Sequence, residues 1–102
     1  MIDVVGLGPG DLDRVPSPTL DLLTDPERTV IARTHDHPAA AQLAERRRVT
    51  FCDDLYEAES TFDDVYEAIA DRVIAATGQG SVVYAVPGSP SVGELAVSKI
   101  LA

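Results

Sequence analysis

The sequence predicts an α/β fold in which an open parallel sheet is built from alternating β-α units. Short apolar runs, typical of buried strands, alternate along the chain with segments whose apolar residues follow a helical period. The last run, residues 81–86, is apolar almost throughout, as expected for a parallel strand covered on both faces. Two stretches rich in glycine and proline, 6–11 and 87–90, each follow a strand, so both are expected at the same edge of the sheet.

Length and charge limit the kind of protein this is. With 102 residues, 45% of them hydrophobic, one domain or part of one is expected. The net charge is −9, from 17 acidic and 8 basic residues, and such a surface repels phosphate backbones and anionic lipids. No nucleic-acid or membrane partner is therefore expected. The single cysteine cannot form an internal disulfide, and no apolar run approaches the roughly 20 residues of a membrane span, so a cytoplasmic protein is predicted.

The first strand is expected at residues 1–5 and leads directly into the loop Gly6-Leu7-Gly8-Pro9-Gly10-Asp11. Glycine has no Cβ, so this backbone can turn sharply and approach a ligand closely. Pro9 stiffens the turn by fixing its own φ. Asp11 should therefore lie at the tip of a rigid loop, just past the end of the strand, where open α/β sheets bind ligands.

A short helix is expected to start at Ser17-Pro18, which supply a capping oxygen and a proline for the first helical position. It should end at Asp25-Pro26, because the residue before a proline is pushed out of the α region. Residues 29–32 are predicted to form the second strand. A polar loop over residues 33–38 should follow it.

The next helix is expected to begin at residue 39 and to close in Arg46-Arg47-Arg48, where positive charge suits a helix C-terminus. Residues 49–51 are predicted to form a short third strand. Residues 52–60 are expected to be a solvated acidic loop.

The strongest helical pattern covers residues 62–77, with Thr61 and Asp64 as a capping pair and glycines 78 and 80 at its end. A further helix is expected from Ser91. The apolar side of the helix over 62–77 has the spacing i, i+3, i+4, i+7 and consists of Phe62, Val65, Tyr66, Ile69, Ala70, Val73 and Ile74.

Several common motifs do not fit. Asp11 stands where the third glycine of a dinucleotide-binding G-x-G-x-x-G loop belongs, and no Walker loop is present. His35, His37 and Cys52 are too few for a closed zinc site, so no metal is expected. Ser89 lacks the G-x-S-x-G frame of a nucleophile elbow.

Several stretches resemble one protein family. Val5-Gly6-Leu7-Gly8-Pro9-Gly10-Asp11 resembles the opening motif of the tetrapyrrole (corrin and porphyrin) methylases, and residues 83–90 resemble their second glycine-proline loop. Residues 32–38, together with 53–56 and 62–67, resemble the branch fused to MazG-type nucleotide pyrophosphohydrolases. The resemblance spans nearly the whole chain.

This resemblance implies that residues 1–102 are a single partial domain, the N-terminal lobe of a dimeric, two-lobed methyltransferase without its C-terminal lobe. S-adenosylmethionine would bind in a cleft between the lobes, and we expect the two glycine-proline loops to be facing walls of that cleft. The implied substrate is a small molecule such as a tetrapyrrole. Asp11 would be catalytic, as the acceptor of a proton. The residues implied in cofactor binding are Gly8, Pro9, Gly10, Pro87, Gly88, Ser89 and Val92.

One departure leaves two functions open. Many members have Gly-Asp-Pro where this chain has Gly88-Ser89-Pro90, so a carboxylate is missing. The chain is therefore either part of an S-adenosylmethionine-dependent methyltransferase or a ligand-sensing module attached to a MazG-type nucleoside triphosphate pyrophosphohydrolase. In the second case, replacing Asp11 by Asn should leave ligand affinity nearly intact and abolish no turnover, so loss of methyl transfer in this variant would exclude the sensing module.

Overall fold

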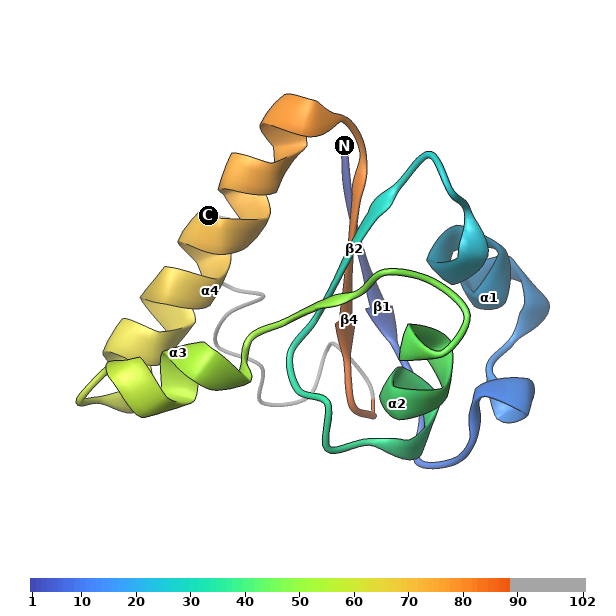
Figure 1. The fold of residues 1–102 in the computed structure, drawn as a ribbon, viewed down its shortest axis with the longest axis horizontal. Helices are drawn as coiled ribbons and strands as arrows, with labels where there is room; N and C mark the ends of the chain where they lie inside the picture. The colour runs from blue at the N-terminus through green and yellow to red at the C-terminus, as the bar shows by residue number, and fades with distance from the viewer. Residues whose placement is uncertain (89–102) are drawn as a thin grey trace.

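The structure is a computed structural model that describes residues 1–88. Within these residues the chain forms a four-stranded sheet, all parallel, in the order β1-β4-β2-β3 (Figure 1). The predicted α/β fold with alternating β-α units is confirmed. The strands are β1 (Ile2–Gly6), β2 (Thr29–Ala32), β3 (Thr50–Phe51) and β4 (Val82–Val86).

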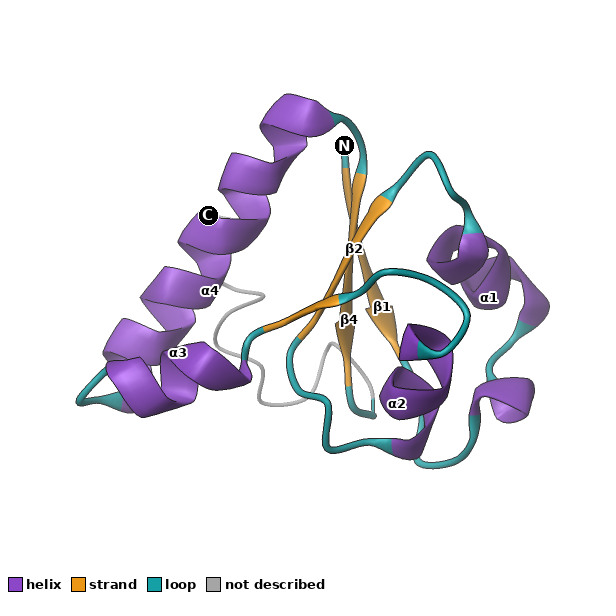
Figure 2. Cartoon of the chain, in the orientation of Figure 1, coloured by secondary structure: helices purple, strands orange, loops and turns teal. Residues whose placement is uncertain are grey.

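Helices cover both faces of the sheet (Figure 2). The connections from β1 to β2 and from β2 to β3 run in one direction along the sheet, whereas the connection from β3 to β4 runs back to a place between β1 and β2. For all three to be right-handed, the last connection must cross the opposite face of the sheet. Accordingly α1 (Ser17–Thr24) and α2 (Pro38–Ala44) lie on one side, and α3 (Asp53–Ala58) and α4 (Phe62–Ala76) on the other. None of the helices within residues 1–88 is long and apolar enough to cross a membrane. Two 3-10 turns, η1 (Leu12–Arg14) and η2 (Thr77–Gln79), complete the described chain.

The central strand β4 divides the core into two layers. All five of its residues are buried, which explains the continuous apolar run. Val83 and Ala85 pack on the side of α1 and α2, whereas Val82, Tyr84 and Val86 pack on the side of α4. This alternation follows from the two-residue period of a strand.

The long helix α4 has the predicted cap, but two residues of its predicted apolar side are exposed. The Thr61 hydroxyl accepts a hydrogen bond from the Asp64 backbone N–H at 3.1 Å, as the capping pattern indicated. Phe62 and Ile74, however, are 71% and 48% exposed. A helix of fifteen residues is about 22 Å long and a strand of five about 17 Å, so the sheet cannot cover the first turn. Ile74 lies five residues after the buried Ile69, which places it about 140° around the helix.

Three other predictions need correction. Residues 53–58 form the helix α3 rather than an acidic loop, with two acids in its first turn, where negative charge is favourable. Ser17 does not cap α1, because Pro16 occupies the N-cap position and no side-chain capping bond forms. The third strand is shorter than expected, since β3 begins at Thr50. The helix predicted from Ser91 lies outside the described residues.

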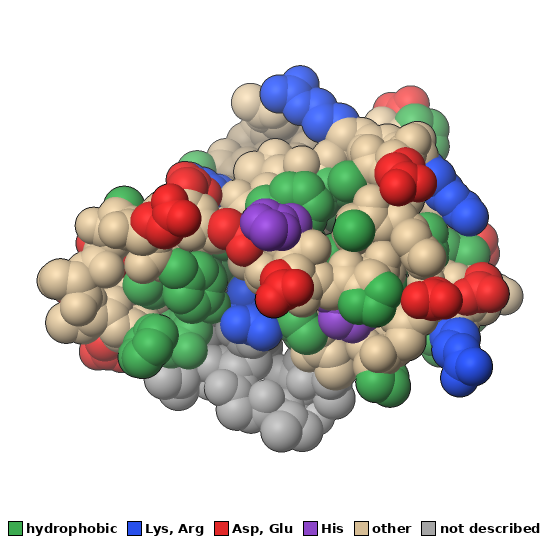
Figure 3. Space-filling view, turned by 60° about the horizontal axis from the view of Figure 1, so that its bottom comes forward, with side chains coloured by type: hydrophobic (Ala, Val, Ile, Leu, Met, Phe, Trp, Pro, Cys, Tyr) green, Lys and Arg blue, Asp and Glu red, His purple; other side chains and the backbone are tan. Residues whose placement is uncertain are grey.

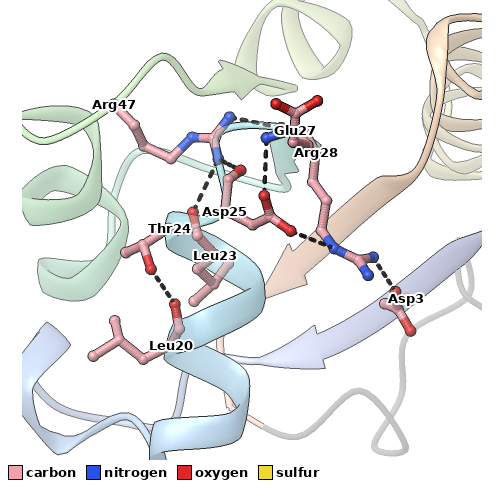
Figure 4. A network of polar contacts seen from close by, with 8 residues as sticks. All are labelled: Asp3, Leu20, Leu23, Thr24, Asp25, Glu27, Arg28 and Arg47. Carbon is pink, nitrogen blue, oxygen red and sulfur yellow. Dashed lines mark hydrogen bonds and ion pairs between the residues drawn. The ribbon is translucent and has the colours of Figure 1, made fainter.

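The helix predicted to close in Arg46-Arg47-Arg48 ends earlier, at Ala44, and Arg47 binds another segment. Its guanidinium reaches back to the C-terminal end of α1 and donates hydrogen bonds to backbone oxygens of Leu23 (3.2 Å), Asp25 (2.7 Å) and Arg28 (2.8 Å) (Figure 4). Arg28 in turn pairs with Asp3 at 2.7 Å and with Asp25 at 3.2 Å. This network fixes the connection between α1 and β2 at the edge of the sheet where the strands begin.

Candidate functional site

The two glycine-proline loops lie side by side where β1 and β4 end, at what we call the carboxyl edge. The Leu7 N–H donates to the Val86 oxygen at 2.8 Å. Gly8 and Gly88 then form an antiparallel bridge, with N···O distances of 3.4 and 3.5 Å. The predicted shared edge is thus confirmed. The predicted facing walls are wrong, because neighbouring strands are only about 4.8 Å apart and their loops meet as one continuous wall.

This wall presents bare backbone. Gly8 and Gly88 have φ values of 70° and 68°, a conformation that glycine adopts readily and other residues rarely. A Cβ added to either glycine would meet no atom within 4 Å, so it would project into open space. A hollow of about 460 Å³ borders the wall, a size typical of small-ligand sites. It is lined by Gly6, Leu7, Gly8, Pro9, Arg14, Pro16 and Gly88.

Asp11 lies at the end of the first loop, where η1 begins. Its backbone oxygen accepts from the Arg14 N–H at 3.0 Å. Its side chain is exposed and forms no hydrogen bond or ion pair with any of residues 1–88. A Cβ at Gly10 would come within 2.9 Å of the Arg14 side chain, so glycine lets this arginine lie close to the loop. The Asp11 carboxylate is therefore accessible on a turn held by backbone bonds.

A second hollow of about 520 Å³ borders Pro87. The Thr34 hydroxyl donates to Asp53 at 2.8 Å, and the His35 backbone N–H donates to the same carboxylate at 3.0 Å. These bonds tie the loop after β2 to the start of α3. The lining residues are Arg33, Thr34, His35, Asp36, Asp53, Tyr56, Glu57 and Pro87.

The loop after β4 borders both hollows, because Gly88 lines the first and Pro87 the second. Figure 3 brings the bottom of Figure 1 forward and shows acidic and histidine side chains on this side of the molecule. The strip of glycine and proline backbone thus has a mainly apolar hollow beside Gly8 and a polar hollow beside Pro87.

His37 is a site residue that the sequence prediction missed. Its Nδ1 accepts from the Ala39 backbone N–H at 3.1 Å, which caps α2. Its Nε2 lies 2.6 Å from the Gly8 oxygen, within the first glycine loop. The signal in the sequence is His37-Pro38, since proline favours the first helical position and marks the residue before it as the cap. The contact with Gly8 joins residues 29 positions apart and has no local signal.

Cys52 directly follows β3 but is no candidate nucleophile. Its side chain is fully buried against α4. Burial raises the pKa of the thiol to about 11, and the nearby Arg72 offsets this only in part. The thiol is therefore protonated at neutral pH. Within residues 1–88, no three His, Cys, Asp or Glu side chains gather in a way that could hold a metal ion.

The structure thus brings six of the predicted site residues to one edge: Gly8, Pro9, Gly10, Asp11, Pro87 and Gly88. The other two, Ser89 and Val92, lie outside the described residues. The donor-binding and catalytic roles of all eight remain predictions.

A family model and a relative of known sequence match this chain. The family model described as Tetrapyrrole (Corrin/Porphyrin) Methylases matches residues 1–101 of the chain. Over 97 residues the chain is 45% identical to the "Uncharacterized protein YabN" of Bacillus subtilis (strain 168). That alignment covers 94% of this chain and 20% of YabN, so the chain spans about a fifth of the relative's length. No solved structure shows a significant match.

Proposed function

Since this chain belongs to the tetrapyrrole (corrin/porphyrin) methylases, a family that generally uses S-adenosylmethionine, we propose that it forms the N-terminal lobe of a methyltransferase. The observation that carries this proposal is the bridge between Gly8 and Gly88. It joins the two glycine-proline loops, 80 positions apart in the sequence, into one backbone surface beside a hollow. At this bridge the two loops offer backbone with open space beside both glycines, which a ligand can approach.

The chain's own residues fit a small cofactor at this surface. Both bridging glycines leave open space where a side chain would stand, so a ligand can contact their backbone. We assign Gly8, Pro9 and Gly10 to one part of the donor site and Pro87 and Gly88 to the adjoining part. By their place in the same loop and the segment after it, Ser89 and Val92 belong to the proposal as well.

Asp11 supplies the chemistry that a methyl transfer to carbon requires. Bound S-adenosylmethionine supplies a methyl group on a positively charged sulfur. When the acceptor carbon forms its new bond to that methyl group, it must lose a proton, and a nearby carboxylate can accept it. The exposed Asp11 side chain is not engaged by any described residue, so it is available for this role. The proposed acceptor is a small molecule such as a tetrapyrrole.

The test is titration calorimetry with the full-length protein that contains this chain. S-adenosylmethionine and its demethylated product should both bind. Asp11→Asn should keep that affinity and lose methyl transfer to a porphyrinogen acceptor, whereas Asp13→Asn, a change at an exposed acid in η1, should retain both. Absence of binding heat with either ligand would contradict the proposal.

A second candidate is a ligand-sensing module attached to a MazG-type pyrophosphohydrolase. The observation in its favour is that about four fifths of YabN lies outside the aligned region, which leaves that protein room for further domains. In this case Asp11→Asn would change no turnover. A homodimer and a cytoplasmic location remain predictions, and sedimentation of the full-length protein tests the first of them.

A further inference from the structure

The helix α2 contacts the first glycine loop at two points through side chains. The first is His37. Because Nδ1 accepts the Ala39 N–H, that nitrogen carries no proton. In a neutral imidazole the proton is then on Nε2, which donates it to the Gly8 oxygen at 2.6 Å. One ring therefore caps a helix and holds the start of the loop.

The second point is Gln42, on the next turn of α2. Its Oε1 accepts the backbone N–H of Leu12 at 2.7 Å. Leu12 is 1% exposed, so its N–H lies where an unpaired donor would be costly. This bond holds the other end of the loop, just after Asp11.

Together these bonds hold both ends of the segment 9–11. Gly8 is fixed by His37 on one side and by the bridge to Gly88 on the other. Asp11 is attached directly to Leu12, whose backbone Gln42 holds. The three residues between the two anchors have little freedom, and they include the exposed carboxylate.

We propose that His37 and Gln42 are positioning residues that clamp the first glycine loop and thereby set the place of Asp11 relative to the donor surface. This deepens the proposed function and rests on it for its catalytic consequence. The clamp itself is a property of the chain, so it is tested without any ligand.

Two substitutions at His37 separate its two bonds. Asn places an amide oxygen near the position of Nδ1, so His37→Asn keeps the helix cap and loses the contact with Gly8. Gln places an amide N–H near the position of Nε2, so His37→Gln keeps that contact and loses the cap. A purely structural histidine would show loop order, donor affinity and stability falling together in both variants.

The first measurement is amide hydrogen exchange of the full-length protein without ligand. In His37→Asn, the Gly8 and Leu12 amides, which donate hydrogen bonds in the native loop, should exchange about tenfold faster, the factor expected for one lost hydrogen bond, while α2 keeps its protection. In His37→Gln the pattern should reverse, with faster exchange at the start of α2. Unchanged exchange of the loop in His37→Asn would overturn the proposal.

Substitutions at Gln42 provide an independent test of the proposal. Gln42→Leu removes the acceptor and should speed exchange of the Leu12 amide about tenfold, whereas Gln42→Glu keeps an acceptor oxygen and should restore it. Equal exchange in the two variants would also overturn the proposal.

The second measurement is affinity for S-adenosylmethionine and turnover with a porphyrinogen. His37→Asn and Gln42→Leu should lower turnover about tenfold, and His37→Gln and Gln42→Glu should retain it. If the wild-type protein binds no donor, the proposed function fails while the exchange data still decide the clamp. If the loop loosens and turnover is unchanged, the positioning role fails and the methyltransferase proposal stands.

Discussion

Arg47 offers the most quantitative prediction, because one guanidinium satisfies three backbone oxygens of the α1–β2 connection. In Arg47→Met the long apolar stem is kept, so mainly the hydrogen bonds are lost. Each is worth about 1 kcal/mol net, which gives about 3 kcal/mol in all. For a domain of this size that loss lowers the melting temperature by roughly 12–24 °C.

The assay is urea and thermal unfolding of the purified protein, followed by circular dichroism. Arg46→Met is the matched control, because Arg46 is exposed and its side chain bonds to no described residue. Arg47→Lys should fall between the two, since an ammonium group cannot reproduce the fork of a guanidinium. If Arg47→Met stays within about 0.5 kcal/mol of Arg46→Met, the network contributes no stability and the reasoning fails.

Two further predictions concern Gly8 and Cys52. Gly8→Ala should lower the free energy of unfolding by about 1–2 kcal/mol and weaken donor binding, because alanine is strained at a φ of 70°. The control is Gly78→Ala, which should be tolerated because Gly78 is at an open position without a positive φ. Equal effects of the two substitutions in calorimetry and unfolding would contradict this prediction. The raised pKa of Cys52, about 11 against an ordinary 9.0, contributes stability that is present below pH 9 and is lost as the pH rises towards 11. Cys52→Ser should show a smaller loss of stability over this pH range. The thiol of the native protein should react with a disulfide reagent only on unfolding. Reaction of the native protein at the rate of the unfolded chain would show that the thiol is not buried.

Features of the fold that depend on local pattern were predictable from the sequence. The continuous apolar run of β4 reports burial on both faces, and the spacing of Thr61 and Asp64 reports a helix cap. In each case the residues that carry the signal are the ones that form the structure, or lie within a few positions of them. The edge shared by the two glycine-proline loops was also predictable, because parallel strands must all end on the same side.

Contacts between distant segments were not predictable. Arg47 follows α2 in the sequence, and only the packing of α1 beside it makes the end of α1 the nearer partner. The segment 53–58 resembles a solvated loop by charge, yet Leu55 and Tyr56 pack against the core beside α4 and stabilise a helix there. The helix cap at His37 likewise has a signal in the neighbouring sequence, whereas the contact of His37 with Gly8 arises only in the folded structure.

The position of β4 explains why the candidate site lies where it does. A sheet in chain order would place β4 at one edge, three strands away from β1, and its loop could not reach Gly8. Insertion between β1 and β2 makes β4 a neighbour of both, so its loop bridges Gly8 through Gly88 and borders the second hollow through Pro87. The strand order, rather than either loop alone, therefore brings the two glycine-proline loops together at one edge of the sheet.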